Sequence, residues 1–418
     1  MKRINYNSLK TILVLMVFIV CFSACKKEVT TVNQTGSTLT GNFDQVFNDF
    51  WNNMNTNYVF WSIDTTNWDN MYKIYNPLFS KLNVYDSSDE TTAKGYFKKM
   101  VDGLVDSHYT LFPDGDFIQP AHDRKLKNPQ FIENLFNTAP YLPSADGRFY
   151  YTNLIDTLYL DSASQHIAID TVTSNANFMI VSGTIKNGDV LYLSFSSFDL
   201  VNEYQGGYPK VKTVLDYFFS QLKNASIKGL VIDVRGNGGG NLQDLNFLVG
   251  SLISSPLHFG YTRSKNGTNR LDYTPWADAV INPTAGAVAY TKPIVVLADG
   301  ESVSLSEITV MSLKTLTNTT FVGDTTWGAN GPLTENAVFN DGSFNFGKVG
   351  TDISSGNVSY YGNAYTSSTM FKYIDNKIYE GKGYPPDVDI KVKLSDIFLP
   401  NNFVDDPQLD KAVTIISP

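Results

Sequence analysis

The chain has 418 residues and a formal net charge of −9, and 42% of its residues are hydrophobic, including 13% aromatic residues. An acidic surface is unfavourable for binding nucleic acid, and this aromatic content excludes a disordered chain. The length corresponds to two domains or to one large α/β unit. Because Cys21 and Cys25 are the only cysteines, we expect no disulfide, thiol nucleophile or cysteine-based metal site in the folded part.

The N-terminus predicts export and a lipid anchor. Basic residues precede an apolar run over residues 11–22, whose length is typical of a signal peptide and short for a membrane span. The run ends in Phe22-Ser-Ala-Cys25, in which small residues precede a cysteine, as at a lipoprotein processing site. We therefore expect residues 1–24 to be a lipoprotein signal peptide and Cys25 to be lipidated. An ordinary signal peptide with an incidental cysteine is the alternative.

Residues 25–42 comprise this cysteine and a stretch rich in Thr, Ser and Gly, which predicts a flexible tether between the membrane and the folded domain. The protein is thus expected in the cell envelope, lipid-anchored to a membrane on the extracytoplasmic side, as an outer-membrane lipoprotein would be. The membrane is one expected partner, and nucleic acid is not.

Residues 43–108 predict an N-terminal helical subdomain. Apolar residues recur with helical spacing over residues 43–54, a second helix should begin after Asn67 and end at Pro77, and a third is expected over residues 91–105. We expect the aromatic stripes of these helices to form the core.

Residues 109–188 predict an irregular β-rich segment, with short β-like runs at 149–152 and 167–170 and without an evident PDZ groove. Strands and helices then alternate through residues 189–400, which predicts an α/β fold with a mostly parallel sheet flanked by helices. Residues 401–418 are assigned to a C-terminal tail. Strands are predicted at 190–195, 229–235, 294–298 and 320–323, and helices at 208–222, 242–253 and 305–316.

A serine cluster in this region is a candidate nucleophile. Ser302-Val-Ser-Leu-Ser-Glu307 follows a buried strand and the turn Asp299-Gly300. In such an arrangement the strand fixes the backbone, the turn exposes a hydroxyl, and the start of the helix offers free N–H groups to a developing oxyanion.

A serine nucleophile normally needs a base, and histidine is the usual one. Of the four histidines, His108 is the best candidate, because it follows Leu104-Val-Asp-Ser107 where the chain leaves the helical subdomain. A structural histidine is the alternative. His122 and His258 lie in connecting segments and are expected at the surface.

The glycine-rich loop at residues 236–240 ends one strand and precedes a helix. Its glycines would let backbone N–H groups approach a ligand oxygen closely. The loop lacks the Gly-Lys-Ser/Thr of a phosphate loop and the glycine spacing of a dinucleotide site. It is therefore either an oxyanion site or a packing turn.

Together these features resemble the tail-specific protease family of serine peptidases, which includes C-terminal processing peptidases and the tricorn core. The resemblance covers residues 43–392 and implies a ClpP/crotonase-like core. Five motifs in the family's order carry it: Leu104-Val-Asp-Ser-His108, the run from Gly229 to Gly240, the run from Ser302 to Ile308, the run from Val322 to Gly328, and the run from Glu380 to Asp387.

The resemblance implies that Ser304 is the nucleophile. The branch that processes C-termini places a lysine base in the segment that here reads Gly328-Ala-Asn-Gly331. Ala329 cannot accept a proton, so a Ser/Lys dyad at this position is excluded, and Lys348 lies well past the motif.

The tricorn-like branch uses a histidine base instead, and this chain contains the corresponding residues. The resemblance implies a relay from Ser304 to His108, which Ser107 and Glu380 orient. The backbone N–H groups of Leu305 and of Gly238 or Gly239 are the implied oxyanion donors. From spacing alone, Glu380 could also be a solvated carboxylate.

The sequence thus predicts a serine-type peptidase that hydrolyses peptide bonds of extracytoplasmic proteins or peptides through an acyl-enzyme. Metal ions and organic cofactors are not expected, because no ligand cluster has metal spacing. An inactive relative that binds peptides, glycans or lipids is the main alternative. An esterase using the same residues is a third.

Overall fold

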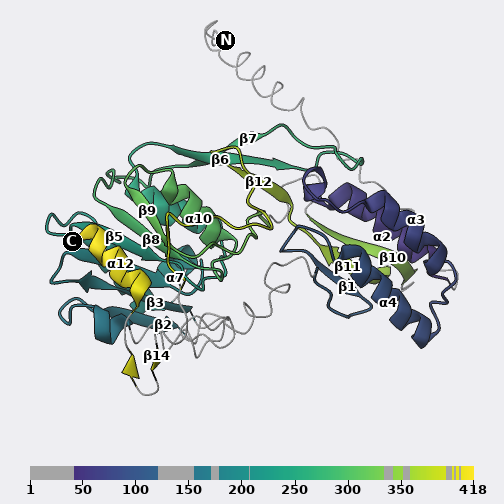
Figure 1. Ribbon diagram of the computed structural model, residues 1–418, viewed down its shortest axis with the longest axis horizontal. Helices are drawn as coiled ribbons and strands as arrows, with labels where there is room; N and C mark the ends of the chain where they lie inside the picture. Colours follow the sequence, from purple (N-terminus) through teal and green to yellow (C-terminus); the bar gives the residue numbers. More distant parts are fainter. Residues whose placement is uncertain are drawn as a thin grey trace, which may run out of the picture. The chain divides into compact units, whose positions relative to one another are not determined.

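The computed structural model describes nine stretches of the chain (Figure 1), and all of them belong to one compact unit, residues 39–418. They are residues 42–120, 155–170, 178–206, 208–333, 342–351, 358–391, 398–399, 402–403 and 406–418. The predicted signal peptide, the lipidated cysteine, most of the tether and the β-like run at 149–152 lie outside them. In these stretches, no helix combines the length and the apolar character that crossing a membrane requires.

A seven-stranded sheet forms the centre of the fold, in the order β13-β9-β8-β5-β4-β3-β2. The pairs from β13 to β4 are parallel, and β3 and β2 are antiparallel, which confirms the predicted mostly parallel sheet. Its strands are β2 (His166–Asp170), β3 (Phe178–Ile185), β4 (Val190–Phe195), β5 (Gly229–Asp233), β8 (Ile294–Ala298), β9 (Thr319–Gly323) and β13 (Val388–Asp389).

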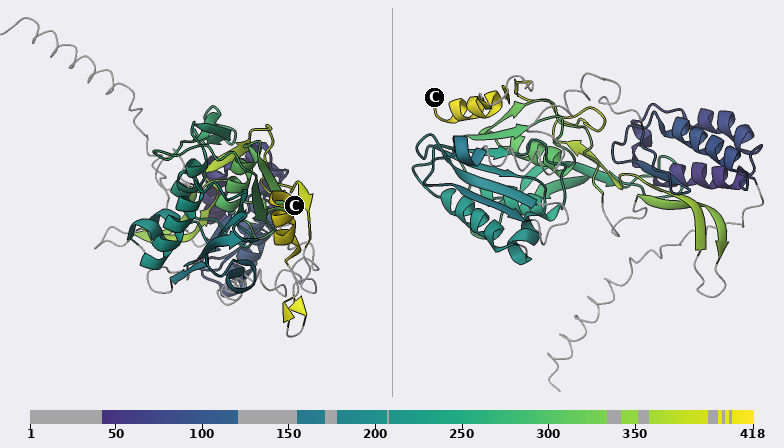
Figure 2. Two further views of the ribbon diagram at one scale, coloured as in Figure 1. Left: turned by 90° about the vertical axis from the view of Figure 1, so that its left-hand side faces the viewer. Right: turned by 90° about the horizontal axis from the view of Figure 1, so that it is seen from below.

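Helices cover both faces of this sheet (Figure 2), so the central strands are buried along their whole length. Leu230 and Ile232 of β5 pack toward α8, α9 and α10. Val231 of β5 points to the other face, where α12 packs. The helices are α7 (Leu200–Gly206), α8 (Pro209–Gln221), α9 (Gln243–Leu248), α10 (Leu305–Lys314) and α12 (Pro407–Ile416).

Two expectations for this region need correction. The helix predicted at 242–253 is the short α9, followed by a 3-10 turn, η3 (Val249–Leu252). The segment assigned to a tail contains α12, whose buried Leu409 and Ile416 pack on the sheet. Two other short elements are η2 (Ile155–Tyr159) and the hairpin of β14 (Phe398–Leu399) and β15 (Asn402–Phe403).

The N-terminal helices pack on a second sheet that the sequence did not predict. Phe50 of α2 and Phe97 of α4 contact Phe346 of β10, with ring centroids 5.2 and 5.5 Å apart. The sheet has the order β1-β11-β10, so two of its strands come from a distant part of the chain. The elements are α2 (Asp44–Asn57), η1 (Val59–Ser62), α3 (Trp68–Phe79), α4 (Ser87–Val101), β1 (Thr110–Pro113), β10 (Ser343–Thr351) and β11 (Val358–Tyr365).

Details of these helices also differ from expectation. Asn67 caps α3, as predicted, by accepting the Asn70 N–H at 3.0 Å. However, α3 continues past Pro77 to Phe79, and α4 ends at Val101. A third sheet, β12-β6-β7, is made of β6 (Leu257–Ser264), β7 (Ala277–Ile281) and β12 (Thr369–Tyr373).

Candidate active site

Ser304 lies where β8 connects to α10, at the N-cap of the helix. Its φ of 56° and ψ of −118° belong to a region that residues other than glycine rarely adopt. Such a backbone persists only where neighbouring contacts enforce it, and it is common at functional sites. The turn therefore presents the Ser304 side chain in a conformation that a helix or strand would not give.

The two neighbouring serines are committed to structural contacts. The Ser302 hydroxyl donates to the Val234 carbonyl at 2.7 Å, and the Ser306 hydroxyl donates to the Asn237 carbonyl at 2.6 Å. Both side chains are fully buried, whereas Ser304 is only half-buried. Of the three hydroxyls, that of Ser304 is the accessible one.

The glycine-rich loop lies directly against the Ser304 turn. At Gly239, whose φ is +92°, an added Cβ would lie 2.8 Å from the Cβ of Ser304 and 2.8 Å from the backbone nitrogen of Leu305. Only glycine can occupy this position without displacing the turn. The structure thus brings together the predicted nucleophile and the predicted oxyanion loop.

The predicted oxyanion donors differ in whether their N–H groups already have an acceptor in the protein. The Gly239 N–H donates to the Asn237 side chain at 2.9 Å, so it is used within the loop. The N–H groups of Gly238 and Leu305 have no acceptor within the described part of the chain. Gly239 therefore matters because it lacks a side chain, and Gly238 and Leu305 are the two candidate donors that remain.

A buried arginine holds the start of this loop in place. The Arg235 guanidinium donates to Asp233 from Nε at 2.9 Å, and from Nη1 to Asp406 and Gln408, each at 2.9 Å. Asp406 and Gln408 lie at the start of α12. The loop beside Ser304 is thus tied to the C-terminal helix across the sheet.

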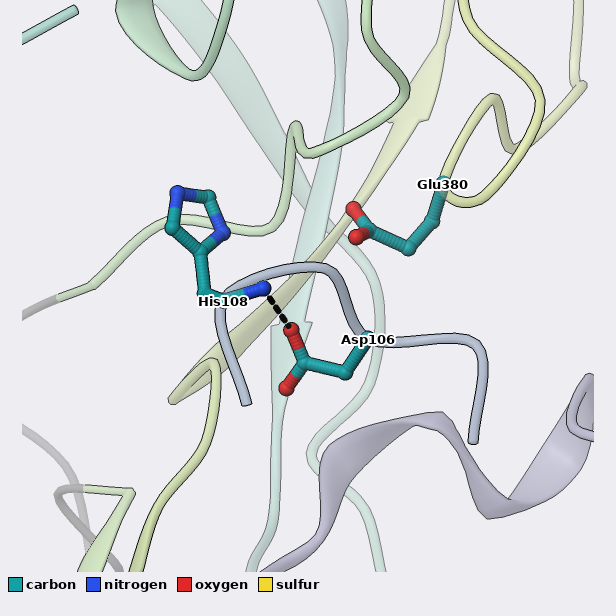
Figure 3. Close-up of side chains that lie close together, drawn as sticks. All are labelled: Asp106, His108 and Glu380. Atoms are coloured by element: carbon teal, nitrogen blue, oxygen red, sulfur yellow. Dashed lines mark hydrogen bonds between the residues drawn. The ribbon is translucent and has the colours of Figure 1, made fainter. Parts of the chain in front are cut away.

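Ser107 and His108 lie in a turn after α4 and not on the helix. The His108 N–H donates to the carboxylate of Asp106 at 2.9 Å. Figure 3 shows the His108 ring near the carboxylates of Asp106 and Glu380, which come from separate parts of the chain.

Asp106 anchors this turn. Its fully buried carboxylate also accepts the Thr366 hydroxyl at 2.6 Å, the Ser367 N–H at 2.7 Å and the Ser367 hydroxyl at 2.9 Å. Burying a carboxylate is costly unless such donors satisfy its oxygens. Asp106 therefore places a negative charge beside His108 and pins its backbone to the connection between β11 and β12.

Glu380 is also buried, which contradicts the alternative of a solvated carboxylate. One oxygen accepts the Ser107 N–H at 3.1 Å, and the other accepts the N–H groups of Asn330 and Gly331, both at 2.8 Å. Burial raises the pKa of Glu380 well above its ordinary value, and the charge of Asp106 adds to this effect.

The structure therefore brings Glu380 against Ser107, but through the main chain of the serine. The Ser107 hydroxyl donates to the carbonyl of Gly328 at 3.3 Å. Ser107 thus connects the histidine turn to two other segments of the site.

Ligand atoms of Asp106, His108 and Glu380 lie within 4.8 Å of one another, a grouping that could hold a metal ion. However, the oxygens of both carboxylates already accept N–H or O–H donors. Metal binding would break these bonds. The two carboxylates are thus better suited to holding the histidine turn than to binding a cation.

The environment of the His108 ring favours its neutral form. Burial lowers the pKa of His108 from its ordinary value of 6.5, and the charge of Asp106 partly opposes this shift. Nδ1 is buried and has no hydrogen-bond partner in the described residues, which also contain no hydrogen bond between His108 and Ser304. Catalytic hydrogen bonds often form only in the substrate complex.

Glu307 links the Ser304 turn to the segment that follows β9. Its fully buried carboxylate accepts the Ser304 N–H at 3.3 Å, the Thr326 hydroxyl at 2.6 Å and the N–H groups of Gly328 and Ala329, both at 2.7 Å. The side chain of Ala329, the position at which the resemblance places the lysine of the other branch, is buried.

Sequence reasoning missed the contributions of Asp106 and Glu307, although both lie inside the motifs used to find the site. The available signal was a carboxylate two or three residues from a candidate catalytic residue. Their hydrogen-bond partners lie far away in the sequence, so spacing could not reveal them.

The other candidates lie elsewhere. His122 is outside the described residues. His258 is on β6, with Nε2 3.5 Å from Asp278, and Lys348 is on β10, paired with Tyr360 of β11. No hydrogen bond of the described residues links either of the last two to Ser304.

Comparison with known proteins gives a matching family profile and a related protease. Residues 189–390 match the profile of peptidase family S41. A carboxy-terminal processing protease, CtpB of Bacillus subtilis (strain 168), is 28% identical over 171 residues, which are 39% of this chain and 33% of the relative. The chain thus matches about a third of the length of that relative.

Solved structures show a similar fold. A candidate peptidase from Parabacteroides merdae ATCC 43184 superposes with a TM-score of 0.60 at 19% identity, over 90% of this chain and 97% of that one. A serine-to-alanine mutant of CPAF gives a TM-score of 0.50 at 13% identity, over 85% and 94% of the two chains. At these identities the likeness concerns the fold alone.

Proposed function

Because the chain belongs to peptidase family S41 through residues 189–390, we propose that it is a serine peptidase that hydrolyses peptide bonds through an acyl-enzyme on Ser304. The observation that carries the proposal is the packing of Gly239 against Ser304 and Leu305. The proposal is supported by the N–H groups of Gly238 and Leu305, which flank the Ser304 hydroxyl and have no acceptor among the described residues.

The proposed reaction begins when Ser304 attacks the carbonyl carbon of the substrate and His108 takes the hydroxyl proton. The N–H groups of Leu305 and Gly238 then stabilise the negative oxygen of the tetrahedral intermediate. The protonated imidazole gives its proton to the leaving amine, which departs with it. In the second half of the reaction, His108 takes a proton from water, which attacks the acyl carbon; the bond to the Ser304 oxygen then breaks, and the imidazolium returns the proton to Ser304.

The remaining groups hold the base in place. Asp106 and Glu380 fix the turn that carries His108, and the charge of Asp106 favours the imidazolium that forms during each half-reaction. Ser107 connects this turn to Gly328. In this scheme Glu380 positions the histidine and does not contact the substrate.

The substrates are proposed to be extracytoplasmic proteins or peptides, because the N-terminal sequence predicts export and a lipid on Cys25. The chain would then act at the surface of a membrane of the cell envelope. Metabolic labelling with a fatty-acid analogue, compared between the parent and Cys25→Ala, tests the anchor.

A serine-reactive fluorophosphonate probe tests the proposed chemistry. The parent should be labelled, the labelled peptide should contain Ser304, and Ser304→Ala should abolish labelling. A folded parent that is not labelled would indicate an inactive relative that binds its ligand without cleaving it. Peptide and small ester substrates, compared side by side, separate a peptidase from an esterase.

A further inference from the structure

We propose that Glu307 is a positioning residue that fixes the Ser304 turn relative to the turn carrying Ser107 and His108, so that nucleophile and base meet during acylation. This inference rests on the proposed function, because it concerns the same site. It assigns a role to a carboxylate that takes no part in the relay described above.

The hydrogen bonds of Glu307 exceed what helix capping requires. A glutamate at the third position of a helix commonly accepts the N–H of the capping residue. Glu307 does so for Ser304, but at 3.3 Å. Its three other bonds, from Thr326, Gly328 and Ala329, are shorter, at 2.6 to 2.7 Å. The carboxylate is therefore held mainly by the segment after β9 and joins that segment to the nucleophile turn.

Gly328 continues this connection toward the base. Its N–H donates to Glu307, while its carbonyl accepts the Gly381 N–H at 2.7 Å and the Ser107 hydroxyl at 3.3 Å. Its φ is +95°, and an added Cβ would lie 2.7 Å from the backbone nitrogen of Gly383. The backbone of Gly328 is thus fixed on both sides, and a single residue links Glu307 to the neighbour of the histidine.

The two acceptor oxygens and the length of Glu307 are both needed for this role. All four groups that face its oxygens are donors, so an amide in its place would bring an NH₂ group against one of them. The segment would then have to shift. A displacement of about 1 Å at reacting groups can lower a rate on the order of 100-fold. Substrate affinity should not change, because Glu307 is fully buried and its oxygens accept donors of the protein itself.

The test measures fluorophosphonate labelling of the full chain at several probe concentrations, which separates the maximal labelling rate from the half-saturating concentration. The variants are Glu307→Gln and Glu307→Asp. Glu203→Gln is the matched control, because Glu203 is a buried glutamate on α7 that accepts the Tyr208 N–H away from the site. Thermal unfolding and far-UV circular dichroism report the folded fraction.

In Glu307→Gln, the maximal rate per folded molecule should fall about 100-fold, with the half-saturating concentration unchanged. The pH midpoint of labelling should also stay unchanged, because Asp106 and Glu380, the carboxylates that face His108, are retained. Glu203→Gln should label at the parental rate. A role in folding alone would lower thermal stability without changing the rate of the molecules that remain folded.

A folded Glu307→Gln that labels at the parental rate would overturn the proposal, as would a loss confined to probe affinity. If this variant does not fold, Glu307→Asp decides, because it keeps the charge but withdraws it by one methylene, and its rate should still fall. A parent that is not labelled at Ser304 would refute the proposed function itself. A labelled parent with equally fast variants would refute only the role of Glu307.

Discussion

Glu307 and Glu380 divide between them four consecutive N–H groups of the main chain. Those of Gly328 and Ala329 donate to Glu307, and those of Asn330 and Gly331 donate to Glu380. The segment at which the resemblance places the lysine base of one branch is here a bridge between two buried carboxylates. A lysine at Ala329 would enter a buried segment whose main chain is already bonded to both carboxylates, so Ala329→Lys should not create a working Ser/Lys dyad.

The first prediction concerns which serine is acylated. Ser306→Ala should keep fluorophosphonate labelling at Ser304 within a few-fold, because the Ser306 hydroxyl is committed to Asn237. Losing this buried hydrogen bond should lower the free energy of unfolding by about 1 to 3 kcal/mol. Peptide mapping after labelling and thermal denaturation measure the two effects. A label on Ser302 or Ser306 would show that the motif register is wrong.

The second prediction concerns the Gly239 position. Gly239→Ala should abolish labelling, because its Cβ would collide with Ser304 and Leu305 and its φ of +92° is unfavourable for alanine. Gly238→Ala is the matched control: an added Cβ meets nothing within 4 Å there, and the N–H donor is retained. Labelling rates of the two variants provide the comparison. Equal rates would argue against the proposed oxyanion site.

The third prediction concerns pH. A histidine base works only when neutral, and burial lowers the pKa of His108 below 6.5. Activity should therefore rise with pH through a midpoint below 6.5. Asp106→Asn should move this midpoint to still lower pH, because it removes the charge that opposes the shift. His108→Ala should lower kcat on the order of 100-fold or more, whereas Lys348→Ala should not affect it. If Lys348→Ala lowered kcat and His108→Ala did not, a histidine base would be excluded.

The fourth prediction separates Glu380 from Ser107. Glu380→Gln should lower kcat with little change in KM, because the carboxylate holds the histidine turn and not the substrate. Ser107→Ala should cost less, since alanine keeps the main-chain N–H that Glu380 accepts. The double variant should lose less than the sum of the two in free-energy terms, because both act on one turn. Steady-state kinetics of the three variants test this; a defect confined to KM would place Glu380 in substrate binding.

The sequence was sufficient for β4, β5, β8 and β9 of the central sheet, because these strands are short apolar runs, buried on both faces, between amphipathic helices. It did not predict β3 or β13. It was insufficient for the sheet beneath the N-terminal helices. Phe344 and Phe346 of β10 complete that core although they lie about 300 residues from Phe50 of α2. Pairing between such distant segments leaves no local periodicity that a reader of the sequence could use.

The same limit applies to the site. Ser304, Ser107 and His108 occur in recognisable motifs, so their selection needed only the sequence and the resemblance. The contacts of Asp106 with Thr366 and Ser367 cross 260 residues and more. Whether a carboxylate is buried or solvated depends on such partners, which explains why Glu380 could be read either way from the sequence.

The packing of α12 has a consequence for the resistance of the protein to proteolysis. Exposed, loosely packed segments are the ones that proteases cut most readily. Here the last helix is embedded in the sheet through Leu409, Ala412 and Ile416, and its first residues hold the buried Arg235. The contacts that support the loop beside Ser304 therefore also keep α12 packed on the sheet, where a protease has little access to it.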